Sequence, residues 1–202
     1  MSAFFLLFVC KDIVMMRRSL ILAALAVLSS APALAQQKVL PTPQSQLGFT
    51  FRQMGVPVQG QFKTWDAQLS FDPKKPEATT VKFNVNMGSV SFGAAETEAE
   101  AAKAPWFNVP KFPQAQFQST AVKAAGPGKL AVSGKLNIKG SVRDVTVPVS
   151  LSQAGGVTTA TGTFAIKRLD FKIGDGEWAD TSIVADDVQV NFKFAVQGVA
   201  PL

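Results

Sequence analysis

The chain has 202 residues, of which 47% are hydrophobic and 17% charged, with no histidine and one cysteine, Cys10. Its 20 basic and 14 acidic residues give a formal net charge of +6. The lack of an imidazole excludes Ser-His-Asp and Cys-His catalysis, and also excludes zinc, copper and haem sites that are built on histidine. Only carboxylate, amine and hydroxyl chemistry remains, so the composition favours binding over catalysis.

The N-terminal segment has the pattern of a cleaved export signal. Two arginines at 17–18 precede an apolar stretch at 20–28, which is shorter than the roughly 20 residues that span a bilayer. Ala-Leu-Ala at 33–35 gives a small-x-small site, with cleavage expected before Gln36. We therefore interpret residues 1–35 as a signal peptide.

The expected organisation is a signal peptide, a linker at 36–44 and one domain at 45–199. Residues 1–15 lie ahead of the basic region and are also consistent with a start codon assigned too early. The chain after the signal has no cysteine, which favours a periplasmic location over an animal secretory route rich in disulfides. Its modest positive excess has no Lys-rich or Arg-rich run, so no nucleic-acid partner is expected.

Apolar and polar residues alternate along this domain with the period of two that is typical of strands with one buried face. Gly-rich turns at 125–128 and 154–156 separate some of these strands. Pro148 lies within a strand and predicts an edge position or a bulge, because proline cannot donate to the ladder. Phe62 is out of phase with the second strand, which predicts a bulge near Thr64. Eight antiparallel strands are expected, around residues 47–51, 65–71, 81–87, 116–121, 129–139, 144–151, 163–167 and 187–196.

One segment, 94–104, breaks this period and predicts a short helix that Pro105 ends. Glu96 and Glu100 are expected on one solvated face with no visible basic partner, rather than as a catalytic pair. The fold class is therefore all-β with one short helix between strands. Periodicity alone does not decide between a sandwich with a filled core and a closed barrel. The aromatic and aliphatic residues of the inner face slightly favour a cavity.

Three passages carry a family resemblance. They are Trp-Phe-Asn followed by Phe-Pro-Gln-Ala-Gln-Phe-Gln-Ser-Thr (106–120), Gly-Lys-Leu-Asn-Ile-Lys-Gly followed by Val-Thr-Val-Pro-Val (134–149), and Arg-Leu-Asp-Phe-Lys-Ile-Gly followed by Asp-Val (168–188). In order and spacing, and together with residues 45–51, they resemble the YceI-like, polyisoprenoid-binding family of periplasmic lipocalin-like barrels. The resemblance implies an eight-stranded antiparallel lipocalin-like barrel that holds a long isoprenoid or similar lipid tail, without catalysis, cofactor or metal.

The chain departs from the family pattern at three positions. Asn108 stands where an acidic residue is usual, Asn137 where threonine is usual, and Gln53 where many relatives carry histidine. The departure at Gln53 puts the head-group preference in doubt, whereas binding of the tail does not depend on it.

A tail-binding site requires a dry tube of matching shape. For its lining the sequence predicts Phe49, Phe51, Phe83, Val85, Met87, Phe117, Phe164, Phe192 and Phe194, with packed core as the alternative for each. Trp106, Phe107 and Trp178 are predicted to rim the mouth, with a plug of the barrel end as the alternative.

Two groups of charged residues are candidates for further sites. A basic group could face an anionic membrane, although a solvated face that protects strand edges is favoured; it contains Lys123, Lys129, Lys135, Lys139 and Arg143. An acidic group has no EF-hand spacing, so no metal site is expected; it contains Asp170, Asp175, Glu177, Asp180, Asp186 and Asp187.

The sequence thus predicts a non-catalytic periplasmic carrier or store for a polyisoprenoid, with a quinone-type or polyprenyl tail. The alternatives are a filled barrel that acts as an interaction or stress-response module, and an enzyme that acts on a lipid inside the barrel. The oligomeric state is left open, with a homodimer as one alternative.

Overall fold

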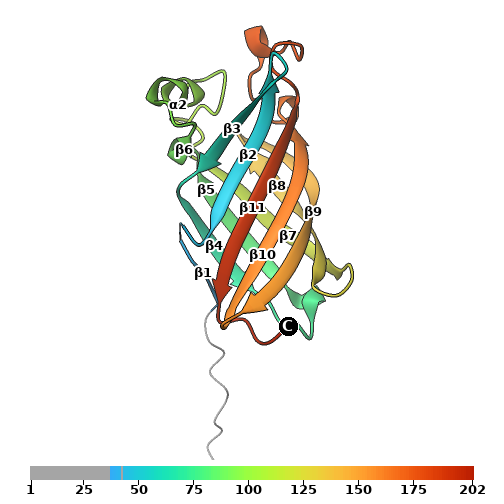
Figure 1. Ribbon diagram of the computed structural model, residues 1–202. Coiled ribbons are helices and arrows are strands. Elements are labelled where there is room, and N and C mark those ends of the chain that lie inside the picture. Colours follow the sequence, from blue (N-terminus) through green and yellow to red (C-terminus); the bar gives the residue numbers. More distant parts are fainter. Residues whose placement is uncertain (1–36, 42) are drawn as a thin grey trace, which may run out of the picture. The chain divides into compact units, whose positions relative to one another are not determined.

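The computed structural model describes residues 37–41 and 43–202, so the expected signal peptide lies outside the described residues. In this part of the chain, one curled antiparallel sheet dominates (Figure 1). Its strands are β1 (Lys38–Val39), β2 (Gln46–Gln53), β3 (Val56–Phe62), β4 (Trp65–Ser70), β5 (Thr80–Asn86), β6 (Val90–Ser91), β7 (Gln114–Ala124), β8 (Lys129–Ile138), β9 (Ser141–Ala154), β10 (Val157–Lys167) and β11 (Asp187–Gln197). The helices are α2 (Ala95–Ala101) and the short 3-10 helices η1 (Pro76–Ala78), η2 (Met87–Ser89), η3 (Leu169–Phe171) and η4 (Gly176–Trp178). No helix among these residues has the length and apolarity needed to cross a membrane.

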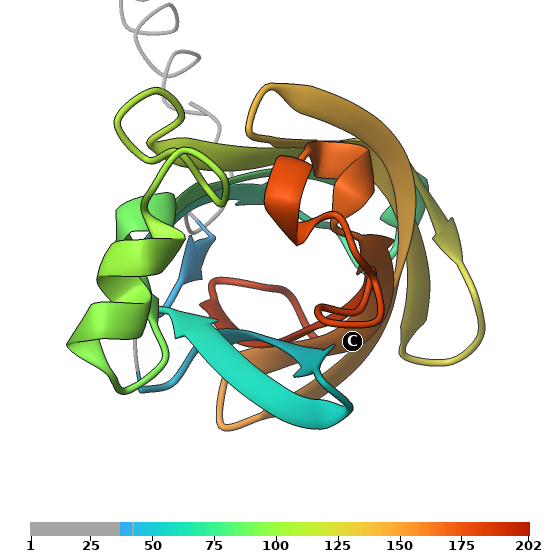
Figure 2. The same ribbon diagram turned by 90° about the horizontal axis from the view of Figure 1, so that it is seen from above.

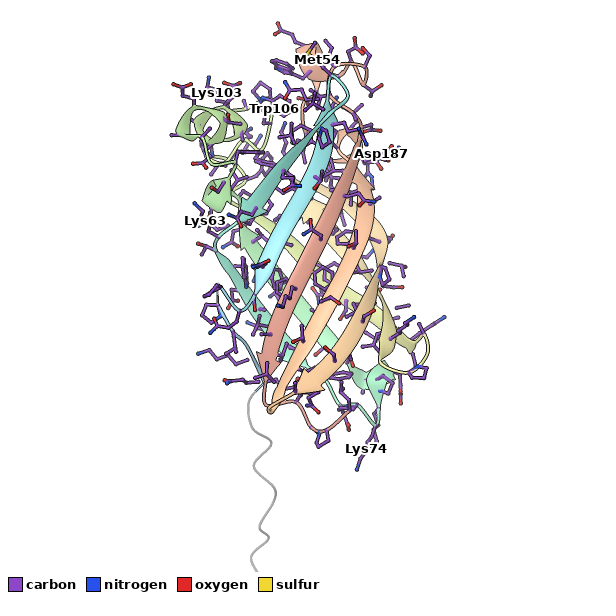
Figure 3. The ribbon with its side chains drawn as sticks, in the orientation of Figure 1. Met54, Lys63, Lys74, Lys103, Trp106 and Asp187 are labelled. Carbon is purple, nitrogen blue, oxygen red and sulfur yellow. The ribbon has the colours of Figure 1, made fainter. Side chains whose placement is uncertain are left out.

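The sheet curls into a barrel in which the first and the last described strands pair. Its strand order is β4-β5-β7-β8-β9-β10-β11-β2-β3-β6, and β1 pairs with the end of β11. The side-chain amide of Gln37 continues this closure, because Nε2 donates to the carbonyl of Phe71 (2.5 Å) and Oε1 accepts from its N–H (2.8 Å). Seen from above, the strands form a ring (Figure 2). Met54 and Trp106 lie at the upper end of the barrel and Lys74 lies at the lower end (Figure 3).

The antiparallel barrel with one short helix confirms the predicted fold class, but three strands were not predicted. β1 lies in the segment expected to be a linker. β3 pairs with β2 on one side and with the short β6 on the other. The predicted bulge near Thr64 is wrong, because Phe62 ends β3 and Lys63 and Thr64 connect it to β4. A register shift is found instead in β7, between Ser119 and Ala121.

The turn predictions and the position of Pro148 are confirmed. Hairpins join β7 to β8 and β9 to β10 at the two Gly-rich turns. Pro148 of β9 pairs with Ala131 of β8. On the other side of β9, the ladder to β10 ends at Ser150 and Thr161, before it reaches Pro148. The missing N–H of proline therefore costs no hydrogen bond to β10.

Glycines on the inner wall make room for aromatic rings. Phe49 covers Gly60, Phe117 covers Gly134 and Phe192 covers Gly162. A Cβ at Gly162 would lie 2.4 Å from the carbonyl oxygen of Pro148 and 2.5 Å from Cζ of Phe192. These three glycines therefore leave the space that the rings fill.

Helix α2 is anchored by the carboxylate of Glu98. Its Oε1 accepts from Ser91 Oγ (2.8 Å), Phe92 N (3.0 Å) and Gly93 N (3.3 Å), all of which precede the helix. The hydrogen bond from Ser91, followed by that from Phe92, holds the pKa of Glu98 below its usual value. The anchor fixes α2 beside β6.

Candidate binding cavity

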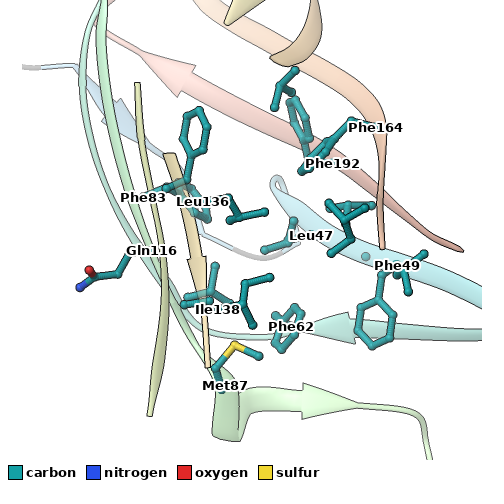
Figure 4. A pocket seen from close by; sticks show the side chains of 18 of the residues that line it. Leu47, Phe49, Phe62, Phe83, Met87, Gln116, Leu136, Ile138, Phe164 and Phe192 are labelled. Atoms are coloured by element: carbon teal, nitrogen blue, oxygen red, sulfur yellow. The ribbon is translucent and has the colours of Figure 1, made fainter. Parts of the chain in front are cut away.

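The barrel encloses an apolar cavity of about 680 Å³ (Figure 4). This volume lies within the range of about 300–1,000 Å³ that is usual for small-molecule sites. Strands β1–β5 and β7–β11 all contribute to the wall, mostly with Phe, Val, Leu and Ile side chains. In Figure 4, Leu47 and Phe49 of β2, Phe62 of β3 and Leu136 of β8 approach the cavity. The interior is therefore a hollow rather than a filled core.

All the site residues predicted from the sequence lie on the wall of this one cavity. They are Phe49, Phe51, Phe83, Val85, Met87, Trp106, Phe107, Phe117, Phe164, Trp178, Phe192 and Phe194. Most of them are half-buried, because their inner side borders the hollow instead of other side chains, whereas Phe49 and Met87 are buried. Their contact with a ligand remains a prediction.

The sequence-based list omitted part of the wall. Val58 and Phe62 were missed because β3 was not recognised as a strand. Val132, Leu136 and Val147 were not chosen, although the alternation had placed them on the inner face. Counting every inner-face aliphatic residue, not only the aromatic ones, would have found them.

Aromatic rings meet across the interior. Phe83 of β5 and Phe194 of β11 have ring centroids 4.8 Å apart, although their strands are not neighbours in the sheet. The ring centroid of Phe194 also lies 6.0 Å from that of Trp65 and 5.1 Å from that of Phe192. These ring contacts therefore join strands on different sides of the interior.

Exposed polar residues of β2 and α2 reach the cavity at the upper end. Gln53, Glu96, Thr97 and the half-buried Glu100 contribute to the wall there, and we call this set the mouth. Glu100 forms an ion pair with Lys103 at 2.5 Å, so the expectation that it lacks a basic partner is wrong. Gln53, one of the positions where the sequence departs from the expected family pattern, therefore lies on the cavity wall at this end.

Two tryptophans pack against each other beside the mouth. The ring centroids of Trp106 and Trp178 lie 5.4 Å apart at an interplanar angle of 42°. A Cβ at Gly174 would lie 2.7 Å from Cζ3 of Trp106, so glycine permits the close approach of the indole. Both residues border the cavity as well as each other.

A buried arginine organises the loop over this end. Arg168 is 2% exposed, and its side chain donates five hydrogen bonds of 2.6–3.2 Å to backbone carbonyls. The acceptors belong to Ile173, Gly174, Trp178, Val184 and Ala185. Burial lowers the pKa of Arg168, and the charge of Asp186 acts in the opposite direction. A guanidinium has five N–H donors, so every donor is used within the protein.

The expected basic face contains one residue that is not on the surface. The Lys139 side chain is 7% exposed, and Nζ donates to the carbonyls of Pro105 (3.0 Å) and Lys172 (2.5 Å), with Asp175 at 3.7 Å. Burial lowers the pKa of Lys139, and Asp175 partly opposes this shift. The assignment of Lys139 to a solvated or membrane-facing surface is therefore wrong. The other members of that face are exposed.

The chain is similar in sequence to known proteins. A family model of the YceI-like domain matches residues 39–196. A UPF0312 protein of Pseudomonas syringae pv. tomato is 30% identical over 152 residues, which cover 70% of this chain and 76% of that protein.

Solved structures show the same architecture. BcnA of Burkholderia cenocepacia is 41% identical, with a TM-score of 0.73 over 75% of this chain and 95% of that one. A domain of Saccharophagus degradans, described as polyisoprenoid binding and implicated in plant cell wall breakdown, is 14% identical. Its TM-score is 0.66 over 82% of this chain and 99% of that domain, and this likeness concerns the fold.

Proposed function

The chain belongs to the YceI-like family, and from this premise we propose that it binds a polyisoprenoid or similar long-chain lipid in the barrel and carries or stores it without catalysis. The observation that carries the proposal is the cavity, whose wall is formed by apolar side chains of ten strands. Transfer of apolar surface from water to such a wall supplies about 25 cal/mol per Å². A lipid tail can therefore be held without hydrogen bonds.

The arrangement of the wall supports a flexible ligand. Phe83 and Phe194, from strands that are not neighbours, contact each other and both line the same cavity. A linear tail with rotatable single bonds can adapt to the space beside these rings. The name of the Saccharophagus domain, which shares the fold, agrees with an isoprenoid tail.

We place the protein in the periplasm after cleavage before Gln36. The support is the basic and apolar pattern of residues 1–35 together with the absence of cysteine from the rest of the chain. Mass spectrometry of the protein recovered from a periplasmic fraction tests this, because a mass that starts at Gln36 is expected. A protein that retains residues 1–35 in the cytoplasmic fraction would contradict the location.

Native mass spectrometry tests the binding itself. The protein is purified gently from its native host, and its mass is compared before and after extraction with organic solvent. We expect a stoichiometric adduct whose mass corresponds to an isoprenoid chain. A mass without adduct, together with no uptake of added quinones or polyprenols, would reject the proposal.

The two alternative functions receive less support from the geometry. A filled interaction module does not agree with a hollow of about 680 Å³. An enzyme that acts on a lipid would need paired carboxylates directed inward, yet the acidic residues on the described wall are Glu96 and Glu100 at the mouth. Asp66 and Asp170 do not line the cavity.

A further inference from the structure

We propose that the cavity selects lipids with an uncharged head group over those with an anionic one, and that Glu96 and Glu100 at the mouth impose this preference. The inference rests on the proposed function and specifies its ligand class. It predicts prenols or quinones, rather than prenyl phosphates or fatty acids, as the preferred ligands.

The first support is the set of charges that an incoming head group meets. Of the described residues that line the cavity, the charged ones are Glu96, Glu100 and Arg168. Glu96 and Glu100 lie one helical turn apart on α2 and therefore share a face. Glu100 is partly neutralised by Lys103, whereas Glu96 is exposed and has no ion pair among the described residues. The carboxylates thus give the mouth a negative potential.

The second support is that the buried Arg168 cannot neutralise the charge of an anionic head group. All five N–H donors of Arg168 are bonded to backbone carbonyls, so a phosphate could gain a donor only by breaking one of these bonds. The broken bond would leave a buried carbonyl without a partner, which is itself unfavourable. Arg168 therefore fixes the loop and offers nothing to an anionic ligand.

The side chain of Lys139 is likewise engaged within the protein. Lys139 does not line the cavity, and its Nζ donates to two carbonyls near Asp175. No described lysine lines the cavity, and Lys103 next to the mouth is paired with Glu100. An anionic head group at the mouth would consequently lose hydration without gaining a cationic partner from the cavity wall. A hydroxyl or carbonyl head group avoids this loss.

The test compares two ligands that share one tail. Geranylgeraniol and geranylgeranyl phosphate are titrated, below their aggregation concentrations and at low ionic strength, into the purified protein depleted of lipid. Binding is followed by the intrinsic fluorescence of the three tryptophans, of which Trp106 and Trp178 border the cavity. We expect the alcohol to bind about tenfold more tightly than the phosphate, as two nearby carboxylates in a partly solvated site would produce.

Variants separate the role of the mouth from that of net charge. In Glu96→Gln/Glu100→Gln the preference should shrink by about tenfold through tighter binding of the phosphate. Glu96→Gln alone, which keeps the Glu100–Lys103 pair, should give part of this shift. The matched control Asp66→Asn/Glu77→Gln removes two exposed carboxylates that do not line the cavity, and should leave the preference unchanged.

The outcomes distinguish this inference from the proposed function. Equal binding of both ligands to the unmodified protein, or a preference that the mouth variants do not alter, would overturn the inference and leave lipid binding intact. Binding of neither ligand, in a protein that also carries no native adduct, would reject lipid binding as well.

Discussion

Arg168 shows how one side chain can hold a loop without a carboxylate partner. Burying a permanent charge is costly unless its donors are satisfied, and here five carbonyl oxygens satisfy them. Arg168 begins one of the family passages, but its burial could not be predicted, because the partners are backbone groups that no residue type encodes. This part of the site could not be predicted from side-chain chemistry.

Replacing Arg168 with lysine should therefore destabilise the protein. Lysine has three donors, so Arg168→Lys leaves at least two buried carbonyls unpaired and should cost about 2–4 kcal/mol of the free energy of unfolding. Urea unfolding followed by circular dichroism measures the loss. Arg143→Lys, at an exposed position, serves as the control and should change stability little. Equal stability of the two variants would contradict the assigned role.

At the scale of elements, the anchor of α2 should make stability depend on pH. The folded state lowers the pKa of Glu98 from 4.5, so its carboxylate stabilises the fold above that value. The contribution is lost as the pH falls through the folded-state pKa, where the carboxylate becomes protonated. The unfolding free energy of the wild type should exceed that of Glu98→Gln at pH 7, and the two should converge below pH 4.5. A difference that stays constant down to pH 3 would exclude this origin.

The glycines of the inner wall should tolerate no side chain. Gly162→Ala places a methyl group against the Pro148 carbonyl and the Phe192 ring, and should cost about 1–3 kcal/mol because the backbone of β9 cannot yield easily. Thermal unfolding measures the effect. A second variant, Gly162→Ala/Phe192→Ala, removes the ring and should show whether the remaining loss comes from the carbonyl. An unchanged Tm in Gly162→Ala would contradict the close approach.

Strand length explains which strands could be predicted. Eight strands were recognisable because several apolar residues alternate with polar ones, even where Gly134 interrupts the series in β8, and the family motifs then identified the barrel. In β3 the inner face reads Val58, Gly60 and Phe62, and Phe49 from the neighbouring strand covers Gly60. Only two apolar side chains thus remain on the inner face of β3, too few to show the alternation, so β3 was missed. β1 and β6 have two residues each, too few for any period.

For the whole molecule, filling the hollow should abolish binding while the barrel persists. Ala160 lines the lower part of the cavity opposite Phe194, so Ala160→Trp should reduce the affinity for a lipid tail at least about tenfold by occupying its space. Thr163→Trp, on the outer face of the same strand, is the matched control. Native mass spectrometry of both variants measures the bound lipid. A full adduct in Ala160→Trp would place the ligand elsewhere.

The pairing of β2 with β11 also dictates when the protein can fold. Ser45, just before β2, is fully buried and accepts a hydrogen bond from the N–H of Ala195, 150 positions further along the chain. A chain that crosses a membrane channel with its N-terminus first cannot complete the barrel until its last strand has emerged, because β2 has no other partner on that side. The topology thus makes the C-terminal strand the one that completes the barrel. Any chain shortened before β11 would leave two unpaired strand edges, at β2 and β10, open to association with other chains.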